Sequence, residues 1–587
     1  MLTIKQRDED YEHKLNTALP RDFHRGDLHS TTRLQGYCDA MYATCATFLV
    51  LPLRNLKEME EEQTLPEFVH ERAGEYVIFF IGFFVICTMW EMNVKRFSVV
   101  KRLDDFLVFL VILSLLATTM LPFSLSLKGH FEREEEGGLI TSGLIASIEL
   151  IEIIIVVIAF NSPRLLHIDL HQSGKAELRY LRNLFLMTSV FNIILCFFAG
   201  AGSFLHYSVT WVLISLVILI PLMRKFNFYV RRRRYFRQNS SNRKKSATNR
   251  RHLYWELSKG NISKERVEAM SDASVAIIAC VLVLDITVEE FPHEVTVHHH
   301  GLHQALHHMG HNIAIFIGAY GMVSAMWYVN HTVLHMFHTI DVVLLYLQKA
   351  FLAFASLSPF CSQVISKFSG RLDEEGSVAT RIGFLFPLCA YISNMCMLFW
   401  GYYKKEKLMH RWAVHGNCLE ANRPAQLYIL LKTTLTPLWI LVGLIASFGP
   451  GHVLQYIRYI VYGLLALTFI VLKLMFMCHL GKKTYVSKRN ASYFSDKGDG
   501  QENRGECEKE KGGIPILEVN GMPLDASINM DGNPTTKSNV ENIDVNDAFK
   551  EKRESVDIEN GILFDFPELD VSSEYLVQLY CSPETLL

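Results

Sequence analysis

Twelve long, mostly apolar stretches constrain the fold of this chain more than any other feature of its sequence. A helix needs roughly 20 apolar residues to cross a bilayer, and backbone groups cannot stay unpaired in lipid, so segments of this length must be helical. We therefore predict an all-α polytopic membrane protein. The twelve predicted spans are residues 34–53, 76–94, 104–126, 138–160, 183–201 and 204–224, then 266–288, 312–333, 340–363, 382–402, 426–448 and 453–477.

The predicted spans form two sets of six, separated by a strongly basic segment. The expected divisions are an N-terminal polar segment at 1–32, a first six-helix set at 33–225, a basic linker at 226–262, a second six-helix set at 263–479 and a polar tail at 480–587. The tail has the composition of a disordered segment.

Charge in the loops predicts the orientation in the membrane, because Lys and Arg favour cytoplasmic loops. The linker carries Arg231 to Arg234, whereas acidic residues from Glu58 to Glu62 and from Glu132 to Glu136 follow the first and third spans. We expect the linker and both termini to be cytoplasmic. The linker arginines are either solvated or in contact with anionic lipid headgroups.

The two sets resemble each other in sequence, which indicates a duplicated six-helix unit. Arg33, Asp39 and three alanines of the first span recur in the same register in the seventh. Trp90 and Asn93 match Trp327 and Asn330, Asp104 matches Asp341, and Pro122 matches Pro359. Because six is even, both copies enter the membrane in the same orientation, as parallel repeats. A dimer of such chains places four equivalent first helices around one axis, whereas a monomer leaves a two-half cleft.

One face of the first span in each set carries small and weakly polar side chains. Helical spacing puts the following residues on these faces: Tyr37, Ala40, Thr44, Thr47 and Leu51 in the first set, and Met270, Ala273, Ile277, Cys280 and Leu284 in the second. Such a face is suited either to close helix packing or to the passage of ions beside hydroxyl groups.

Ionisable and amide side chains within the spans are candidates for structural or functional sites. We expect Asp39 and Asp272 to be hydrogen-bonded by neighbouring helices, and Arg33 and Arg266 to extend toward the membrane interface. Trp90, Asn93, Trp327 and Asn330 are expected to pack against the first span of their own set. Glu149 and Glu152 share a face of the fourth span, where they either bond between helices or relay protons.

Histidines follow the seventh span, in a segment that we predict to be a loop on the luminal side. Imidazole titrates between about pH 5 and 8, so this loop is a candidate for luminal pH sensing. Metal binding and a plain solvated loop are the alternatives. The histidines are His293, His298, His299, His300, His303, His307, His308 and His311.

The start of the seventh span carries a specific resemblance. It reads Ser263-Lys-Glu-Arg266-Val-Glu-Ala-Met-Ser-Asp272, followed by Ala276-Ile277 and Leu284-Asp285-Ile286. This resembles the second-repeat signature of the transmembrane protein 175 family, whose hallmark is Arg, three residues and then Phe-Ser-Asp. The family comprises lysosomal and endosomal potassium channels that also conduct protons. The resemblance covers residues 33–480 and is weaker in the first set.

The resemblance implies a homodimer in which four first helices line a pore without a carbonyl selectivity filter. The implied gate is formed by Thr44 and Ile277, with further narrow positions at Leu51 and Leu284. An adjoining selectivity layer is implied at Thr47 and Cys280, with Ala43 beside it.

The sequence departs from the family pattern at several of these positions. Thr44 stands where the family has isoleucine, which predicts a constriction that wets more easily. Cys280 replaces a threonine and offers a weaker polar group. Asn93 and Asn330 stand where the family has histidine, so any role of that histidine in proton transfer is lost or moved.

These features favour a channel for potassium ions and protons in the endosomal or lysosomal membrane. A secondary transporter and a non-conducting relative that acts through binding partners remain alternatives; the absence of Gly and Pro from the middle of both first helices favours the channel. With a net charge of -2, the chain has no global attraction to nucleic acid. The 12 cysteines lack metal-ligand spacing, no enzyme motif is present, and we expect no metal or cofactor.

Overall fold

A computed structural model describes most of the membrane region of the chain. The described residues are 28–54, 63–131, 134–162, 165–167, 170, 175–238, 262–289, 291, 294–368, 374–414, 423–449, 456–458 and 460–477. The polar tail, most of the N-terminal segment and most of the basic linker, on which we made predictions above, lie outside these residues.

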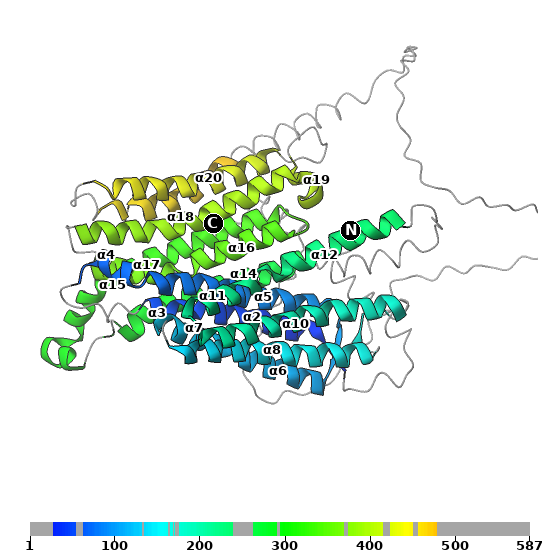
Figure 1. Ribbon diagram of the computed structural model, residues 1–587. Helices are drawn as coiled ribbons and strands as arrows, with labels where there is room; N and C mark the ends of the chain where they lie inside the picture. Colours follow the sequence, from blue (N-terminus) through cyan, green and yellow to red (C-terminus); the bar gives the residue numbers. More distant parts are fainter. Residues whose placement is uncertain are drawn as a thin grey trace, which may run out of the picture. The chain divides into compact units, whose positions relative to one another are not determined.

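The first set of helices runs from α2 to α12 (Figure 1). Its helices are α2 (Thr31–Phe48), α3 (Val50–Leu53), α4 (Leu65–Glu71), α5 (Ala73–Phe97), α6 (Asp105–Thr119), α7 (Leu121–His130), α8 (Glu135–Asn161), α10 (Lys175–Ser203), α11 (Tyr207–Leu216), the 3-10 helix η4 (Val217–Leu219) and α12 (Ile220–Gln238). A short antiparallel pair of strands, β1 (Leu28–Ser30) and β2 (Arg102–Asp104), joins the start of α2 to the start of α6.

The second set runs from α14 to a last helix at Tyr456–Met477. Its elements are α14 (Lys264–Leu284), the π-helix η6 (Asp285–Glu289), α15 (Glu294–His335), α16 (Val342–Ala355), α17 (Ser358–Phe368), α18 (Glu374–Tyr403), α19 (Lys405–Leu408), the 3-10 helix η7 (Arg411–Ala413) and α20 (Arg423–Ala446).

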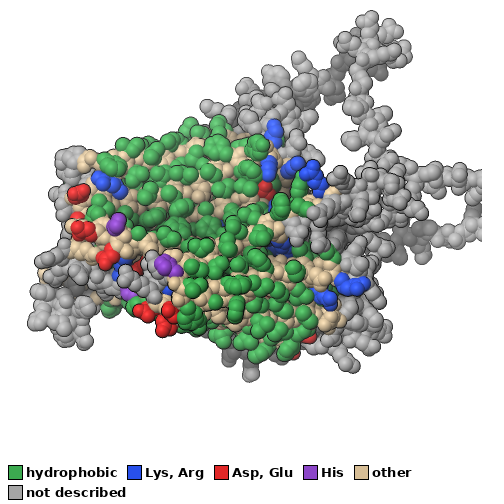
Figure 2. Space-filling view, in the orientation of Figure 1, with side chains coloured by type: hydrophobic (Ala, Val, Ile, Leu, Met, Phe, Trp, Pro, Cys, Tyr) green, Lys and Arg blue, Asp and Glu red, His purple; other side chains and the backbone are tan. Residues whose placement is uncertain are grey.

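Among the described residues, 11 helices are long and apolar enough to cross a membrane, and they coincide with eleven of the twelve predicted spans. This confirms an all-α polytopic membrane protein. The first predicted span is also helical, as α2 and α3, but it does not reach the same hydropathy because it carries Arg33, Asp39 and several threonines. Figure 2 shows the consequence at the surface, a broad apolar band with charged side chains gathered at its two edges.

The corresponding helices of the two sets begin and break in the same way. Asp104 accepts a hydrogen bond from the backbone N–H of Leu107 at 2.9 Å and caps α6, and Asp341 does the same for Leu344 at the start of α16. Side-chain caps of this kind satisfy backbone donors that have no partner within the helix. Both spans are then interrupted before a proline, so that α7 and α17 continue them as separate helices.

The two sets are in contact because α2 packs against α14, the first span of the other set, and α5 packs against α16, which begins the third span of the other set. Lys349 of α16 reaches the Glu91 carboxylate of α5 at 2.7 Å, and both side chains are almost fully buried. Lys95, one turn along α5, contacts the same carboxylate. A buried carboxylate needs this compensation, because an unpaired charge in a membrane interior is costly.

Candidate ion pathway

Asp39 on α2 connects the two sets beside the candidate pore face. One carboxylate oxygen accepts a hydrogen bond from the indole N–H of Trp90 on α5 at 2.8 Å. The other lies 2.6 Å from a guanidinium nitrogen of Arg266, which belongs to α14 of the other set. Asp39 is 2% exposed, so the arginine and the tryptophan replace the water that it would otherwise need.

Asp272, the counterpart of Asp39 on α14, has only half of this environment. It accepts the equivalent hydrogen bond from Trp327 of α15 at 2.8 Å. Within the described part of the chain no cation pairs with it, and its side chain is exposed. Arg33, the counterpart of Arg266, is exposed as well. The two sets therefore share one Arg–Asp pair, and one arginine and one aspartate are left at the surface.

This arrangement confirms that Asp39 and Asp272 are hydrogen-bonded by neighbouring helices. The prediction for Arg266 was wrong, because its guanidinium points inward to Asp39 and does not extend to the membrane interface. A carboxylate forms a strong charge-assisted pair with a guanidinium, but the local sequence gives no sign that this carboxylate comes from the other set.

Asn330 packs against the first helix of its own set, as predicted. It accepts a hydrogen bond from the Ser271 hydroxyl of α14 at 3.0 Å and donates to Gln348 and Asn394 at 2.9 and 2.8 Å. Asn93, its counterpart, is buried at 4% exposure. The amides of Asn330, Gln348 and Asn394 hold the helices of the second set together without any charged group.

The predicted face of α2 is only partly accessible. Tyr37 and Ala40 are exposed, and Thr44 and Leu51 are half-buried. Ala43 and Thr47, in contrast, are almost fully buried within the chain at 0% and 1% exposure.

The accessible face of α2 is therefore rotated slightly away from the predicted one. The Thr47 hydroxyl donates to the backbone carbonyl of Ala43 at 3.0 Å. Phe48, which is not on the predicted face, is 40% exposed. Ala43 and Thr47 belong instead to the side of α2 that carries Asp39, one and two turns along.

On α14 the accessible face includes the side that is buried on α2. Ala273, Ile277 and Leu284 are half-buried and Cys280 is exposed, whereas Met270 is buried at 2% exposure. Asp272, Ala276 and Cys280 correspond to Asp39, Ala43 and Thr47. All three are exposed on α14, while all three counterparts on α2 are buried. The same surface is thus covered in one set and bare in the other.

The glutamates of α8 bond between helices, as one of the two predicted alternatives had it. Glu149 accepts a hydrogen bond from the Asn192 amide of α10 at 2.6 Å. Glu152 pairs with Arg96 of α5 and accepts a hydrogen bond from the Ser114 hydroxyl of α6 at 3.3 Å. Glu91, Glu149 and Glu152 are thus three buried carboxylates of the first set, each with polar or charged partners, and helical spacing did not predict the partners of Glu91. The clearest signal of these partners was Lys349, an ionisable residue within a predicted span.

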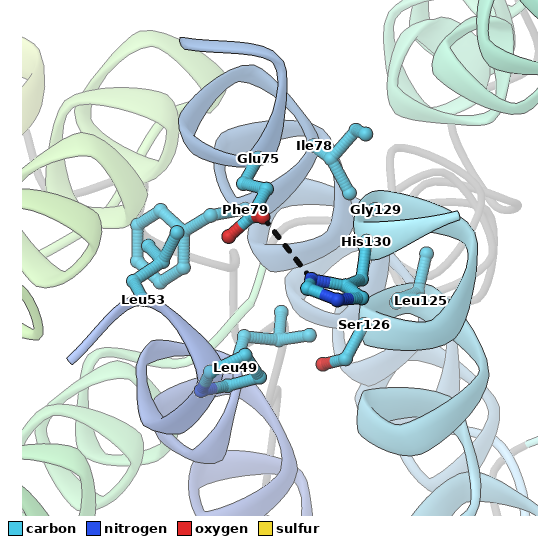
Figure 3. A pocket seen from close by; sticks show the side chains of 10 residues that line it. Leu49, Leu53, Glu75, Ile78, Phe79, Leu125, Ser126, Gly129 and His130 are labelled. Carbon is cyan, nitrogen blue, oxygen red and sulfur yellow. Dashed lines mark ion pairs between the residues drawn. The ribbon is translucent and has the colours of Figure 1, made fainter. Parts of the chain in front are cut away.

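A small pocket lies at the C-terminal end of α2, between α3, α5 and α7. Leu49 and Leu53 form one wall, and the His130 imidazole lies 3.4 Å from a carboxylate oxygen of Glu75 (Figure 3). The cavity volume is about 20 Å³, which is enough for one water molecule. It is too small for an organic ligand.

The histidine-rich segment is helical where the structure describes it, so its prediction as a loop was wrong. Helix α15 begins at Glu294 and continues to His335, with a kink at Gly301, whose φ of 78° is readily adopted only by glycine. The side chains of His303, His307 and His311 are exposed. The structure does not describe the side chains of the other five histidines, which are His293, His298, His299, His300 and His308. No group of metal-ligating residues is present among the described residues.

Comparison with known proteins agrees with this geometry. The sequence profile of the family described as "Endosomal/lysosomal potassium channel TMEM175" matches residues 33–122 and again residues 266–359. Each match starts at one of the two arginines and ends within the third span of its set.

Curated relatives cover more of the chain. An endosomal/lysosomal proton channel TMEM175 of Danio rerio is 27% identical over 311 residues, which is 52% of this chain and 58% of the relative. The chain thus spans less than two thirds of that relative. The protein of the same name from Gallus gallus is 27% identical over 390 residues, covering 65% of this chain and 76% of the relative. A potassium channel of Streptomyces collinus is 22% identical over 135 residues, covering 23% of this chain and 63% of the relative.

The duplicated match of the family profile, the extended similarity to its curated members and the Trp–Asp hydrogen bond that recurs in both sets all lead to one assignment. Over residues 33–122 and 266–359, the chain matches the TMEM175 family.

Proposed function

We propose that this protein is a cation channel of endosomal or lysosomal membranes, which conducts potassium ions, protons or both. The names of its relatives support this function and this location. The observation that carries the proposal is the bare surface of α14. Asp272, Ala276 and Cys280 are exposed, although their counterparts on α2 are buried and Asp39 is paired with an arginine.

A second copy of the chain would satisfy both exposed charges. In a two-fold dimer, α2 of the partner packs on the bare side of α14 in the same way that α2 and α14 pack within one chain. Arg33 of each subunit then pairs with Asp272 of the other, which reproduces the Arg266–Asp39 pair. The result is a closed ring of four alternating helices, two from each subunit, in which no surface of this type stays uncovered.

The ring would enclose the half-buried face of both helices. In this arrangement Thr44 and Ile277 form the gate, and Leu51 and Leu284 form a second narrow layer. Cys280, Thr47 and Ala43 lie in the contacts between neighbouring helices of the ring. The Thr44 hydroxyl donates to the carbonyl of Ala40 at 2.8 Å, so its oxygen presents only lone pairs to the pore. Lone pairs attract cations and hydrate a constriction that isoleucine would keep dry.

The distribution of charge supports an orientation with both termini in the cytoplasm. Figure 2 shows Asp, Glu and His side chains mostly at one edge of the apolar band and most of the visible Lys and Arg at the other. Lys95 and Arg96 at the end of α5, and Lys404, Lys405 and Lys407 after α18, belong to the basic edge in the predicted topology. Cytoplasmic loops carry this excess of Lys and Arg.

Charge reversal tests the dimer and the pore together. Arg33→Asp and Asp272→Arg should each lower the dimer fraction on size-exclusion chromatography with light scattering, because each places two like charges across the subunit joint. The double variant restores an ion pair of opposite polarity and should recover the dimer. Arg266→Asp with Asp39→Arg is the matched control, because it exchanges the same charges within one subunit.

Recordings from enlarged endosomes then test conduction, with potassium, sodium and luminal pH varied in turn. We expect current in the wild type and in the Arg33→Asp, Asp272→Arg double variant, and loss of current in the single variants. A monomeric wild type, or a double variant that stays monomeric, would refute the ring. A dimer that catalyses only coupled, saturable exchange would refute the channel and favour a transporter.

A further inference from the structure

A cleft on the side of α15 is not accounted for by the proposed pore. It lies between α15 and the last helix, Tyr456–Met477, and has a volume of about 470 Å³. This size lies within the ~300–1,000 Å³ typical of sites that bind small molecules. Its lining includes Ile317, Gly318, Gly321 and Tyr328 on α15, and Tyr462 and Phe469 on the last helix.

The cleft exists because α15 carries small residues where the opposite helix carries rings. A Cβ atom added at Gly318 would come within 2.9 Å of the Tyr462 ring, so the two helices touch there. A Cβ atom added at Gly321, one turn further along, would meet no atom within 4 Å. The helices therefore diverge from Gly321 onward, and the space between them is lined almost entirely by carbon.

The surroundings of the cleft identify the medium that it faces. Ile317 on one rim is 62% exposed, and Leu467 and Ile470 beside the other rim are 53% and 57% exposed. Exposed apolar side chains on a membrane-spanning helix face either lipid or another protein. The cleft opens into the hydrocarbon region, where the acyl chains of lipids are the most abundant apolar molecules.

A buried cation lies at one end of the cleft. The Lys432 ammonium group of α20 lies 3.7 Å from the centroid of the Tyr328 ring and 4.6 Å from that of Tyr428, and it donates to the Thr332 hydroxyl at 3.3 Å. Lys432 is 2% exposed, and within the described part of the chain no carboxylate forms an ion pair with it. Aromatic faces compensate a desolvated ammonium group only in part. An anionic group at this end would complete the compensation.

A second lysine lies at the same end. Lys473 follows the lining residue Phe469 by one helical turn on the last helix, and its side chain is exposed. In the proposed orientation, this end of the cleft lies toward the cytoplasmic surface, where lipid phosphates are found. A cation at the interface attracts anionic headgroups in addition to the burial of the acyl chain.

We propose that the cleft is a binding site for a phospholipid of the cytoplasmic leaflet. One acyl chain fills the space beside Gly321, and the anionic headgroup lies toward Lys432 and Lys473. The site is close to the proposed pore helix, because Trp327, adjacent to the lining residue Tyr328, donates to Asp272 of α14. Lipid in the cleft fixes the position of α15 and so of this hydrogen bond. Binding itself does not depend on the proposed channel function, whereas its effect on current does.

Native mass spectrometry of the full-length protein tests the site directly. Protein is transferred from detergent after incubation with phosphatidylserine or phosphatidylcholine, and the retained lipid is counted. Gly321→Phe should lower retention about tenfold or more, because the ring takes the volume of several lipid methylene groups. Gly463→Phe is the matched control. It lies on the last helix outside the cleft lining, and a Cβ atom there also meets no atom within 4 Å.

The outcomes separate the possible occupants. Lys473→Gln should remove the preference for phosphatidylserine over phosphatidylcholine while leaving retention of phosphatidylcholine unchanged. Equal retention by Gly321→Phe and Gly463→Phe would refute the site. A Gly321→Phe protein that changes its oligomeric state would also refute it, because the occupant would then be a second copy of the chain.

Recordings from the same variants test the coupling. Gly321→Phe should alter the current relative to Gly463→Phe, and unchanged current with lost lipid would refute the link through Trp327. If the wild type retained lipid but carried no current at all, the lipid site would stand and the proposed channel function would fail.

Discussion

Glu91→Gln should destabilise the protein more than any other change to the contact between the two sets. Glu91 is 0% exposed and is in contact with two ammonium groups, those of Lys349 at 2.7 Å and of Lys95. Neutralising the carboxylate leaves both cations buried without a counter-charge. Removal of one partner of a buried ion pair typically costs ~3–5 kcal/mol, so we expect a loss of this size in the free energy of unfolding.

Lys349→Met provides an internal comparison. It removes one of the two cations and leaves Glu91 paired with Lys95 within the same helix, so we expect a clearly smaller loss. Glu135→Gln is the surface control, because Glu135 is exposed in the first turn of α8 and surface changes usually stay within ~0.5 kcal/mol.

Unfolding by sodium dodecyl sulfate in bicelles, followed by intrinsic fluorescence, measures these differences. A double-mutant cycle with Glu91→Gln and Lys349→Met then isolates the energy of the contact between the sets. A Glu91→Gln protein as stable as the Glu135→Gln control would refute the reasoning, because it would mean that Glu91 is already neutral or hydrated in the membrane.

The other predictions concern gating and pH. Thr44→Ile should lower the resting current, since a methylene-rich gate wets less easily; Thr44→Ser keeps the hydroxyl and is the control, and an equal or larger current in Thr44→Ile would show that this face is not the gate. Replacement of all eight histidines between His293 and His311 by Gln should reduce the response of the current to luminal pH, and an unaltered response would exclude them as the sensor. Burial and the nearby Lys264 lower the pKa of His410 below its usual value of about 6.5. Below that pH the unfolded chain therefore binds more protons than the folded protein, so stability should fall as the pH drops below about 6.5. His410→Gln should weaken this dependence in thermal unfolding between pH 7.5 and 5.5 (~2 pH units around that value), and an unchanged slope would assign it to other groups.

Much of the fold could be predicted because membrane insertion makes a strong demand on sequence. Spans must be long and apolar, so their positions follow from hydropathy, whereas their ends differ from the predicted ones by several residues. The helix α2 shows the limit of this rule, because its polar residues lower its hydropathy below that of the other spans. Its resemblance to α14 compensated for the weaker signal.

The site could be predicted only as far as one helix determines it. Spacing identified Thr44, Leu51 and Ile277 on accessible faces, but it also included Thr47, which is buried. Helical spacing gives a face to within about one residue, and the packing of neighbouring helices decides the rest. The pairing of Arg266 with Asp39 joins residues from different sets, and no local pattern encodes such a contact.

The buried pair at Glu91 also has a consequence for synthesis. Lys349 lies 258 residues further along the chain, and at ~5–20 residues per second a ribosome needs roughly 13–50 seconds to produce it after Glu91. Of the two lysines that pair with Glu91 in the described part of the chain, Lys95, one turn away on α5, is already present during this interval. Lys95 therefore acts as a temporary counter-ion for Glu91 in the nascent chain. This lets Glu91 enter the bilayer before Lys349 has been made.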